Sequence, residues 1–138
     1  MCCLGNALTA SWGGMGVLWN KNVCFVFVRP SRYTYEFVER EEFLTLSFFD
    51  ENYRDALKLC GSKSGREMDK VAACGLTPMT TDAGGIAFSE ARLVLTCKKL
   101  YHQEIDPKQF LDAGLEKNYN GADYHRMYVC EVVEALKK

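Results

Sequence analysis

Two short runs of β-branched and aromatic residues in the first half of the chain predict strands. Residues 22–29 read Asn-Val-Cys-Phe-Val-Phe-Val-Arg, and such an apolar run is typical of a strand that is buried on both faces. Pro30 then ends this strand, because proline lacks the N–H that a strand interior needs. Residues 43–49 have the same composition and predict a second strand.

The second half of the chain predicts two longer strands. In residues 91–101, the apolar positions from Leu93 to Cys97 alternate with polar ones, which indicates a half-exposed strand. The last run, residues 124–136, is rich in Tyr, Val and Met and predicts a long terminal strand. Residues 131–138 alone also fit a helix, so both interpretations stay open at this end.

Short helices are predicted between these strands. Ser31 is a candidate N-cap for a helix that continues to about Arg40, with Tyr33 and Phe37 on one face at a spacing of four. A second helix follows a candidate N-cap at Asp50. Its apolar face is formed by residues at positions i, i+3, i+4 and i+7, namely Tyr53, Ala56, Leu57 and Cys60.

The boundaries of the helical segments follow from glycine and proline. Gly61 is expected to end the second helix, because glycine is common just after a helix C-terminus. Residues 67–73 and 108–111 predict two shorter helices, the latter starting at Pro107.

Since strands outnumber the short helices, we predict a mainly β fold. A barrel or tight sheet with small helices packed outside it, in one domain over residues 1–138, fits this pattern.

Charge and composition exclude several classes of protein. The 138 residues include 17 basic and 18 acidic side chains, and a net charge of −1 argues against nucleic-acid binding, which needs a basic excess on one face. The longest apolar run, residues 23–28, is far shorter than the roughly 20 residues of a membrane-spanning helix. The first residues lack the pattern of a signal peptide, so we expect a cytoplasmic protein that does not act at a membrane.

The seven cysteines are expected to be reduced thiols. Their number is odd, and an export signal is not predicted, which argues against a disulfide framework. Cys2 and Cys3 are adjacent, and adjacent thiols chelate poorly; we therefore predict no metal site. The remaining cysteines stand alone in the sequence and are interpreted as small buried hydrophobic residues: Cys24, Cys60, Cys74, Cys97 and Cys130.

Three loops rich in glycine and hydroxyl groups are candidates for ligand binding, because a rigid β scaffold usually holds its ligand on loops. Residues 6–14 offer hydroxyls, backbone amides and the Trp12 indole. Residues 29–34 place two arginines at a predicted helix start, where an anion is favoured. Residues 60–66 combine serines with cations and could cradle a phosphate, although they contain no Walker A motif. Ordinary turns and solvated loops remain the alternative interpretation.

Two histidines could carry chemistry near neutral pH, but neither has a metal-ligand partner at short spacing. His102 is expected to be an exposed residue at a strand end. His125 could face a cofactor, and a structural hydrogen bond is an equally good interpretation. A hydrolase is disfavoured because the Gly-x-Ser-x-Gly motif is absent and Ser64 lies in a different context.

Taken in order, five segments resemble the flavin reductase family with the FMN-binding split-barrel fold, in particular its flavoredoxin-like members. They are residues 6–14, 28–34, 43–49, 60–66 and 123–129, so the resemblance covers nearly the whole chain. It implies a split β-barrel of the Greek-key type with short peripheral helices, and an FMN held noncovalently at a homodimer interface. It also implies an NAD(P)H:flavin oxidoreductase: NAD(P)H or a redox protein would donate electrons, and flavin or an acceptor protein would take them.

The resemblance assigns roles to particular residues. The segment that lines the isoalloxazine ring would comprise Asn6, Leu8, Thr9, Ala10, Ser11 and Trp12. The grip on phosphate and ribityl would comprise Arg29, Ser31, Arg32, Thr34, Ser62, Lys63 and Ser64. His125 would lie near the ring as the catalytic candidate, although the flavin itself does the hydride chemistry. Trp12, Trp19 and Tyr119 are candidate aromatic residues of the dimer interface.

The sequence departs from the family pattern in two places. Relatives carry an N-terminal segment with a barrel strand before the Asn-x-x-Thr-Ala-Ser-Trp motif, whereas only five residues precede Asn6 here. Leu8 stands where Met is expected, a change that conserves volume. Three alternatives to the enzyme remain: an FMN-bound electron carrier, a truncated copy with impaired flavin binding, which the short N-terminus suggests, and a ligand-binding barrel without redox function, which composition alone favours.

Overall fold

The computed structural model describes residues 2–3 and 6–138. Of the five residues that precede Asn6, three lie outside the described residues, namely Met1, Leu4 and Gly5. The expectation of a short N-terminal segment therefore concerns residues that are only partly described. The strands are β1 (Cys2–Cys3), β2 (Asn6–Ala7), β3 (Gly13–Leu18), β4 (Lys21–Val28), β5 (Phe43–Phe48), β6 (Pro78–Thr80), β7 (Ile86–Phe88), β8 (Leu93–Glu104) and β9 (Arg126–Lys137). The helices are α1 (Tyr33–Arg40), α2 (Arg54–Ser62) and α3 (Lys70–Ala73), with 3₁₀ turns η1 (Glu51–Tyr53), η2 (Pro107–Gln109) and η3 (Ala113–Asn118).

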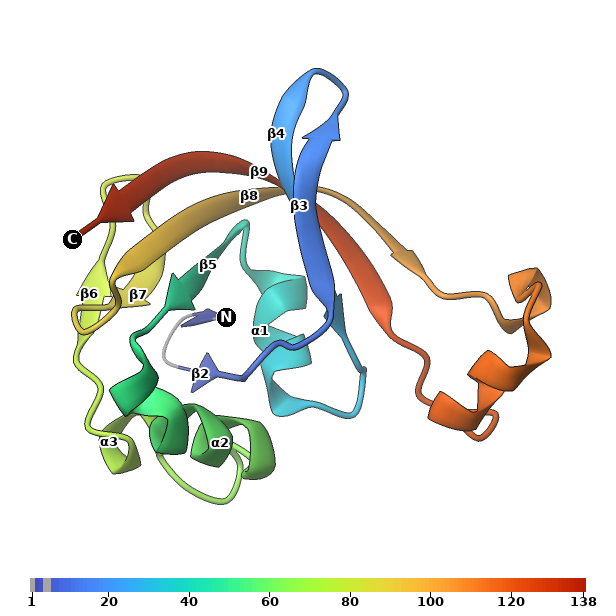
Figure 1. The fold of residues 1–138 in the computed structure, drawn as a ribbon, viewed down its shortest axis with the longest axis horizontal. Helices are drawn as coiled ribbons and strands as arrows, with labels where there is room; N and C mark the ends of the chain where they lie inside the picture. Colours follow the sequence, from blue (N-terminus) through green and yellow to red (C-terminus); the bar gives the residue numbers. More distant parts are fainter. Residues whose placement is uncertain (1, 4–5) are drawn as a thin grey trace.

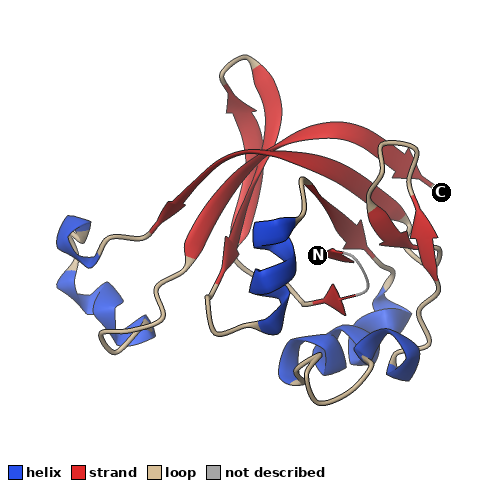
Figure 2. Cartoon of the chain, turned by 180° about the vertical axis from the view of Figure 1, so that it is seen from behind, coloured by secondary structure: helices blue, strands red, loops and turns tan. Residues whose placement is uncertain are grey.

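A seven-stranded antiparallel sheet forms the body of the described chain, in the order β2-β1-β5-β8-β9-β4-β3. The long strands β8 and β9 pair along their length and arch over α1, while α2 and α3 lie below the sheet (Figure 1). A separate hairpin, β6-β7, lies beside the end of the arch. The prediction of a mainly β fold with short helices outside it is therefore confirmed (Figure 2).

Strand β4 shows how the sequence pattern positions the site. Val26 and Val28 point into the main core, where they pack with buried side chains of α1, β5, β8 and β9. Phe25 and Phe27 lie on the opposite face and are only half-buried, so the prediction of a strand buried on both faces is wrong at these two positions. Both rings line hollows instead: Phe25 borders one that α2 also lines through Leu57 and Cys60, and Phe27 borders another beside His125.

Strand β3 was not predicted. It is exposed along most of its length and glycine-rich, so it lacks the alternation of apolar and polar residues that indicates a strand. It pairs with β4 through a tight hairpin whose tip residues, Trp19 and Asn20, both have positive φ angles of 54° and 57°. Such angles fit the turn geometry that matches the twist of a two-residue hairpin.

Two helix boundaries differ from the prediction. Ser31 does not cap α1; the N-cap is Arg32, which gives no side-chain cap, and the Ser31 hydroxyl donates to Asp123 at 2.6 Å. Gly61 does not end α2, which continues to Ser62. A Cβ at Gly61 would lie 3.3 Å from the Thr9 Cβ, so glycine here permits close packing against the segment after β2.

Other predicted helical segments are shorter or capped differently. The segment 67–73 is helical only over α3, because the Asp69 carboxylate accepts from the Ala72 N–H and starts the helix there. Asp50 provides no side-chain cap to the turn that follows it. The predicted helix 108–111 is the single 3₁₀ turn η2. The sequence pattern does not predict the helical turn η3.

Residues 105–125 form a helical arm that connects β8 to β9 and stands away from the barrel (Figures 1 and 2). At its base the Ile105 N–H donates to the His125 carbonyl at 3.0 Å. The arm therefore begins and ends at neighbouring points of one strand pair. Within the described ranges 2–3 and 6–138, none of the helices is both long and apolar enough to cross a membrane.

Candidate functional site

Three adjoining hollows surround the segment that follows β2. The anion cavity, of about 230 Å³, is lined by Leu8, Ser31, Arg32, Tyr33, Thr34, Lys63, Ser64, Gly65 and Lys70. The aromatic cavity, of about 210 Å³, is lined by Leu8, Thr9, Ala10, Ser11, Trp12, Phe27, Val28, Arg29, Arg32 and His125. Leu8 and Arg32 border both cavities, so the two lie side by side.

The third hollow, the apolar groove, has a volume of about 440 Å³ and is the largest of these three. It is bounded by the segment 7–15 and by aromatic side chains of β4, β5 and β7, including Phe25, Phe48 and Phe88. Residues 8–12 border both this groove and the aromatic cavity. The first candidate loop of the sequence is thus the wall between the two.

Positive charge gathers in the anion cavity. Arg32, Lys63 and Lys70 line it, and among the described residues that line it none is acidic. Lys70 is only 5% exposed, and its ammonium group donates to the Cys60 carbonyl at 3.1 Å. Burial lowers the pKa of Lys70 from its ordinary value, because removing an ammonium group from water disfavours the charged form. An anion bound in this cavity would stabilise the protonated form of the Lys70 ammonium group.

The wall of the anion cavity is held by a buried hydrogen bond. The Asn6 amide donates to the Thr34 hydroxyl at 3.0 Å, and both side chains are buried. Gly65 passes close by, since a Cβ at this position would lie 2.6 Å from the Asn6 Oδ1 and 2.9 Å from the Tyr33 ring. Asn6 therefore shapes the cavity from behind, while Thr34 borders it.

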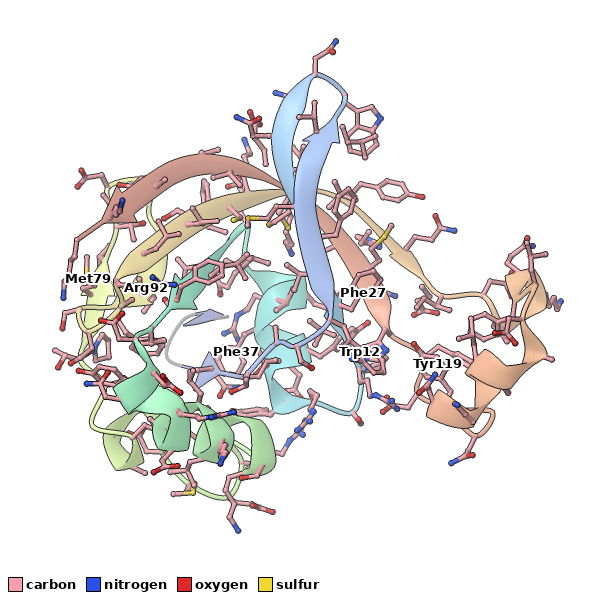
Figure 3. The ribbon with its side chains drawn as sticks, viewed as in Figure 1. Trp12, Phe27, Phe37, Met79, Arg92 and Tyr119 are labelled. Carbon is pink, nitrogen blue, oxygen red and sulfur yellow. The ribbon has the colours of Figure 1, made fainter. Side chains whose placement is uncertain are left out.

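Rings from three distant segments meet in the aromatic cavity. The Trp12 ring centroid lies 5.0 Å from that of His125, and the Phe27 ring packs edge-on to His125 at 6.4 Å. Figure 3 shows Trp12 and Phe27 close together at the base of the β3-β4 pair, with Tyr119 on the neighbouring arm. Trp12 is 51% exposed, so one side of this ring is open to solvent or to a ligand.

His125, the last residue of the arm, is held by another residue of the arm, Tyr119. Its Nδ1 hydrogen-bonds to the Tyr119 hydroxyl at 2.8 Å, and both residues are buried. Burial lowers the pKa of His125, and the nearby Arg29 lowers it further, whereas Asp123 has the opposite effect. The imidazole is therefore neutral at pH 7 and can offer one donor and one acceptor.

Arg29 and Arg32 differ in their partners. Arg29 donates to the Asn118 carbonyl at 2.8 Å and lies 3.9 Å from the Asp123 carboxylate, so its guanidinium binds the arm. Its carbon also lies 5.1 Å from the centre of the Tyr119 ring. Arg32 makes one long hydrogen bond, of 3.4 Å, to the Gly61 carbonyl. Of the two arginines, Arg32 is the one that borders the anion cavity.

The remaining predicted residues are spread around the cavities. Ser31 binds Asp123 through both its backbone N–H and its hydroxyl, and Ser64 and Lys63 line the anion cavity. The Thr9 hydroxyl donates to the Leu57 carbonyl, which ties this segment to α2. Ser62 borders none of the three hollows, because it lies in the last turn of α2 and donates to the Leu59 carbonyl at 3.3 Å.

Sequence reasoning missed two side chains of the site. Lys70 falls within the predicted helix 67–73, and a single sequence does not distinguish a buried lysine from a solvated one. Phe27 lies in an apolar run, which predicts a core position for its side chain and not a position beside a ligand. The described residues include no group of three or more His, Cys, Asp or Glu side chains placed to hold a metal ion.

Comparisons with known proteins give the fold and the family. A family model described as "Flavin reductase like domain" matches residues 5–137. No curated protein shows a significant match. Among solved structures, the chain is similar to an FMN-binding protein from Thermus thermophilus with bound p-hydroxybenzaldehyde, at 22% identity and a TM-score of 0.73, covering 96% of this chain and 64% of that one.

Two further structures show the same fold. A flavoredoxin from Methanosarcina acetivorans has 19% identity and a TM-score of 0.76, covering 96% of this chain and 61% of that one. A flavin reductase-type protein with a split barrel domain from Shewanella frigidimarina NCIMB 400 has 17% identity and a TM-score of 0.74, covering 96% and 60%. The predicted split-barrel fold and the family resemblance are confirmed. The chain spans about three fifths of the length of these proteins.

Proposed function

Because the chain belongs to the family of proteins with a flavin reductase like domain, we propose that it is an FMN-binding oxidoreductase. It would transfer electrons from NAD(P)H to flavin or to an acceptor protein. The observation that carries this proposal is that a cationic cavity and an aromatic cavity lie side by side and share Leu8 and Arg32 in their lining. A molecule with a phosphate at one end and a flat aromatic ring at the other could bind in both cavities at once.

The anion cavity fits the phosphate of FMN. Arg32, Lys63 and Lys70 supply positive charge, and the Ser64 hydroxyl supplies a neutral donor. The cavity also lies at the start of α1, whose N-cap gives no side-chain hydrogen bond, and the dipole of a helix N-terminus favours an anion. The ribityl chain would then pass Leu8 toward the aromatic cavity.

The aromatic cavity fits the isoalloxazine ring. Trp12 and Phe27 offer apolar faces, and the exposed segment Thr9 to Ser11 offers backbone amides to the polar edge of a ring. His125 is oriented by Tyr119 and neutral, so it can hold a hydrogen bond to a ring or to an incoming nicotinamide without adding charge. When bound, FMN supplies the hydride chemistry, and the protein supplies position and electrostatics.

An FMN titration tests the cofactor, and a steady-state assay tests the activity. We expect the purified protein to bind one FMN per chain, seen as a flavin absorbance spectrum or as quenching of flavin fluorescence. We also expect NADH or NADPH to be oxidised in the presence of added FMN. A colourless protein that fails to take up FMN would overturn the proposal and favour the truncated copy with impaired flavin binding.

An FMN-bound electron carrier is a second candidate, because the structures that resemble this chain include flavoredoxins. Such a protein would bind FMN and accept electrons from another protein. The two candidates separate in the steady-state assay. A carrier binds FMN with the same affinity but oxidises neither NADH nor NADPH when FMN is in excess.

We also propose that the protein is a homodimer. The exposed apolar side chains along the edge strand β3 and at its two ends, namely Trp12, Met15, Val17 and Trp19, support this proposal, since an exposed apolar edge of a sheet favours association. Tyr119 was a candidate for the same interface, but it is buried against His125 and Tyr124 within the chain. Light scattering tests the proposal: a monomer mass at all concentrations would contradict it.

A further inference from the structure

Two cysteines that stand 14 positions apart in the sequence meet between α2 and α3. The Cys60 and Cys74 sulfur atoms lie 3.3 Å apart, and both thiols are free. Cys60 is buried, whereas Cys74 is partly exposed and also donates to the Ala56 carbonyl at 3.3 Å. A disulfide needs a sulfur–sulfur distance of about 2.05 Å, so the two atoms must approach by little more than an ångström.

The other described thiols lie in a different environment. Cys24, Cys97 and Cys130 are fully buried in the main core, each with an exposed fraction of 0%. Reagents in solution cannot reach them without unfolding the sheet. Among the five cysteines whose side chains the structure describes, the Cys60–Cys74 pair alone combines a close partner with access to solvent through Cys74.

The pair also adjoins the anion cavity. The Cys60 carbonyl accepts a hydrogen bond from the Lys70 ammonium, and the next carbonyl, of Gly61, accepts one from Arg32. Cys74 is the C-cap of α3, the short helix that begins at Lys70. Two cations of the cavity are thus positioned by the same segments that the thiols would join.

We propose that Cys60 and Cys74 form a redox-active dithiol, which a low-molecular-weight disulfide oxidises to an intramolecular disulfide, and that this bond tightens anion binding by fixing α2 against α3. The disulfide would close the loop of residues 61–73, which carries Lys63, Ser64 and Lys70. A cavity that is already ordered loses less entropy when its ligand binds. The effect on FMN affinity rests on the proposed function, whereas formation of the disulfide does not.

The reaction balances as thiol–disulfide exchange. The more accessible Cys74 thiolate attacks one sulfur of oxidised glutathione, which forms a mixed disulfide and releases one glutathione thiolate. Cys60, after losing its proton, attacks the Cys74 sulfur and releases the second glutathione. The two protein thiols lose two electrons and two protons, and oxidised glutathione is reduced to two glutathione molecules.

The second step is expected to be the slower one. Burial and the contact with Cys74 raise the pKa of Cys60 to about 11, so little of this thiol is ionised at pH 7. Release of the second glutathione should therefore accelerate as the pH rises from 7 to 9. An ordinary thiol, with a pKa of about 8.5, is largely ionised by about pH 9.5. Acceleration that continues above this pH therefore distinguishes closure of the pair from simple oxidation of an exposed thiol.

Peptide mass spectrometry tests the disulfide. The native protein is incubated with oxidised glutathione, alkylated and digested with trypsin. We expect a disulfide between the peptides Leu59–Lys63 and Val71–Arg92, together with unmodified Cys24, Cys97 and Cys130. Absence of this linked pair, or a glutathione that stays on Cys74, overturns the proposal.

Two variants identify the cysteine that attacks oxidised glutathione, and their circular dichroism spectra show whether they fold. In Cys60→Ser, Cys74 keeps its access to solvent but loses its partner, so glutathione should remain trapped on the Val71–Arg92 peptide. In Cys74→Ser, the buried Cys60 should remain unmodified under the same conditions. Reversed labelling of the two variants overturns the assignment. The circular dichroism spectra of both should match that of the native protein.

The FMN dissociation constant tests the effect on the cavity. We expect the oxidised protein to bind FMN about three- to tenfold more tightly than the reduced one, and Cys60→Ser to show no difference between the two conditions. A disulfide that leaves the dissociation constant unchanged overturns the link to the anion cavity. If neither form binds FMN, the proposed function fails, while the mass measurement still decides whether the disulfide forms.

Discussion

The anion cavity and the aromatic cavity differ in how the chain builds them. The anion cavity is made largely by two local segments, the start of α1 and the loop between α2 and α3, and buried hydrogen bonds hold its wall. The aromatic cavity is assembled from the segment after β2, from β4 and from the residue before β9, and its histidine is oriented by the helical arm. The anion cavity therefore presents positive charge from segments that are close in sequence. The aromatic cavity forms only when segments that are distant in sequence pack together.

The largest effect on ligand binding is expected from the buried cation. In Lys70→Met the anion cavity loses an ammonium group while most of the volume is kept. FMN affinity should fall by about 10- to 100-fold, which corresponds to roughly 1.5–3 kcal/mol for a hydrogen bond to a charged group. Fluorescence titration measures the change.

Lys58→Met is the matched control for this prediction. Lys58 lies on the exposed side of α2 and borders none of the three hollows. It removes the same charge from the chain without touching the cavity. Equal affinities of the two variants would mean that the phosphate does not bind beside Lys70.

A smaller effect is expected at the aromatic end. Trp12→Ala removes an exposed ring that contacts His125, and FMN affinity should fall about fivefold, or roughly 1 kcal/mol, the scale of an aromatic pair. Trp19→Ala is the control, because this ring lies at the β3-β4 tip and packs against Tyr101. An equal loss in both variants would point to a general effect of the hairpin.

The arm should contribute to stability through its contact with His125. Tyr119→Phe removes the buried hydrogen bond to the His125 Nδ1 and should lower the free energy of unfolding by about 1 kcal/mol. Urea unfolding measures this change. Tyr101→Phe removes a hydrogen bond between two exposed side chains and should have almost no effect.

The pH dependence of stability is expected to be the most modest effect. The pKa of His125 is lowered in the folded state, so below about pH 6.5 the unfolded chain binds a proton that the folded chain does not. The free energy of unfolding should therefore decrease as the pH falls below this value. In His125→Gln the decrease between pH 7 and 5.5 should become shallower; an identical slope would contradict the assignment.

The sequence predicts well the parts of the fold whose residues repeat a simple pattern. Strands β4, β5, β8 and β9 lie where the apolar runs place them, within a few residues at each end. Strand β3 could not be found in this way, because its glycines and exposed side chains carry no alternation. The missed turn η3 lies in the arm, where few side chains are buried and composition gives little signal.

The candidate site, like the fold, has parts that the sequence predicts and parts that it does not. The loop segments that were singled out do come together around the two cavities, since hydroxyls, glycines and arginines are recognisable by type. Which side chain faces a cavity depends on packing that the sequence does not display. Lys70 faces the anion cavity because Asp69 caps α3 and places Lys70 at its first position, and Ser62 does not because α2 continues past Gly61.

The position of the arm has a consequence for engineering. Strands β8 and β9 pair with each other up to the residues that precede and follow the arm, so in topological terms residues 105–125 are the loop of one long β-hairpin. New chain ends opened at Leu111, whose side chain is fully exposed, would leave this strand register intact. Loops of other lengths grafted at the same position could alter what reaches His125 without changing the barrel. The arm is thus a suitable place for circular permutation or for grafted loops.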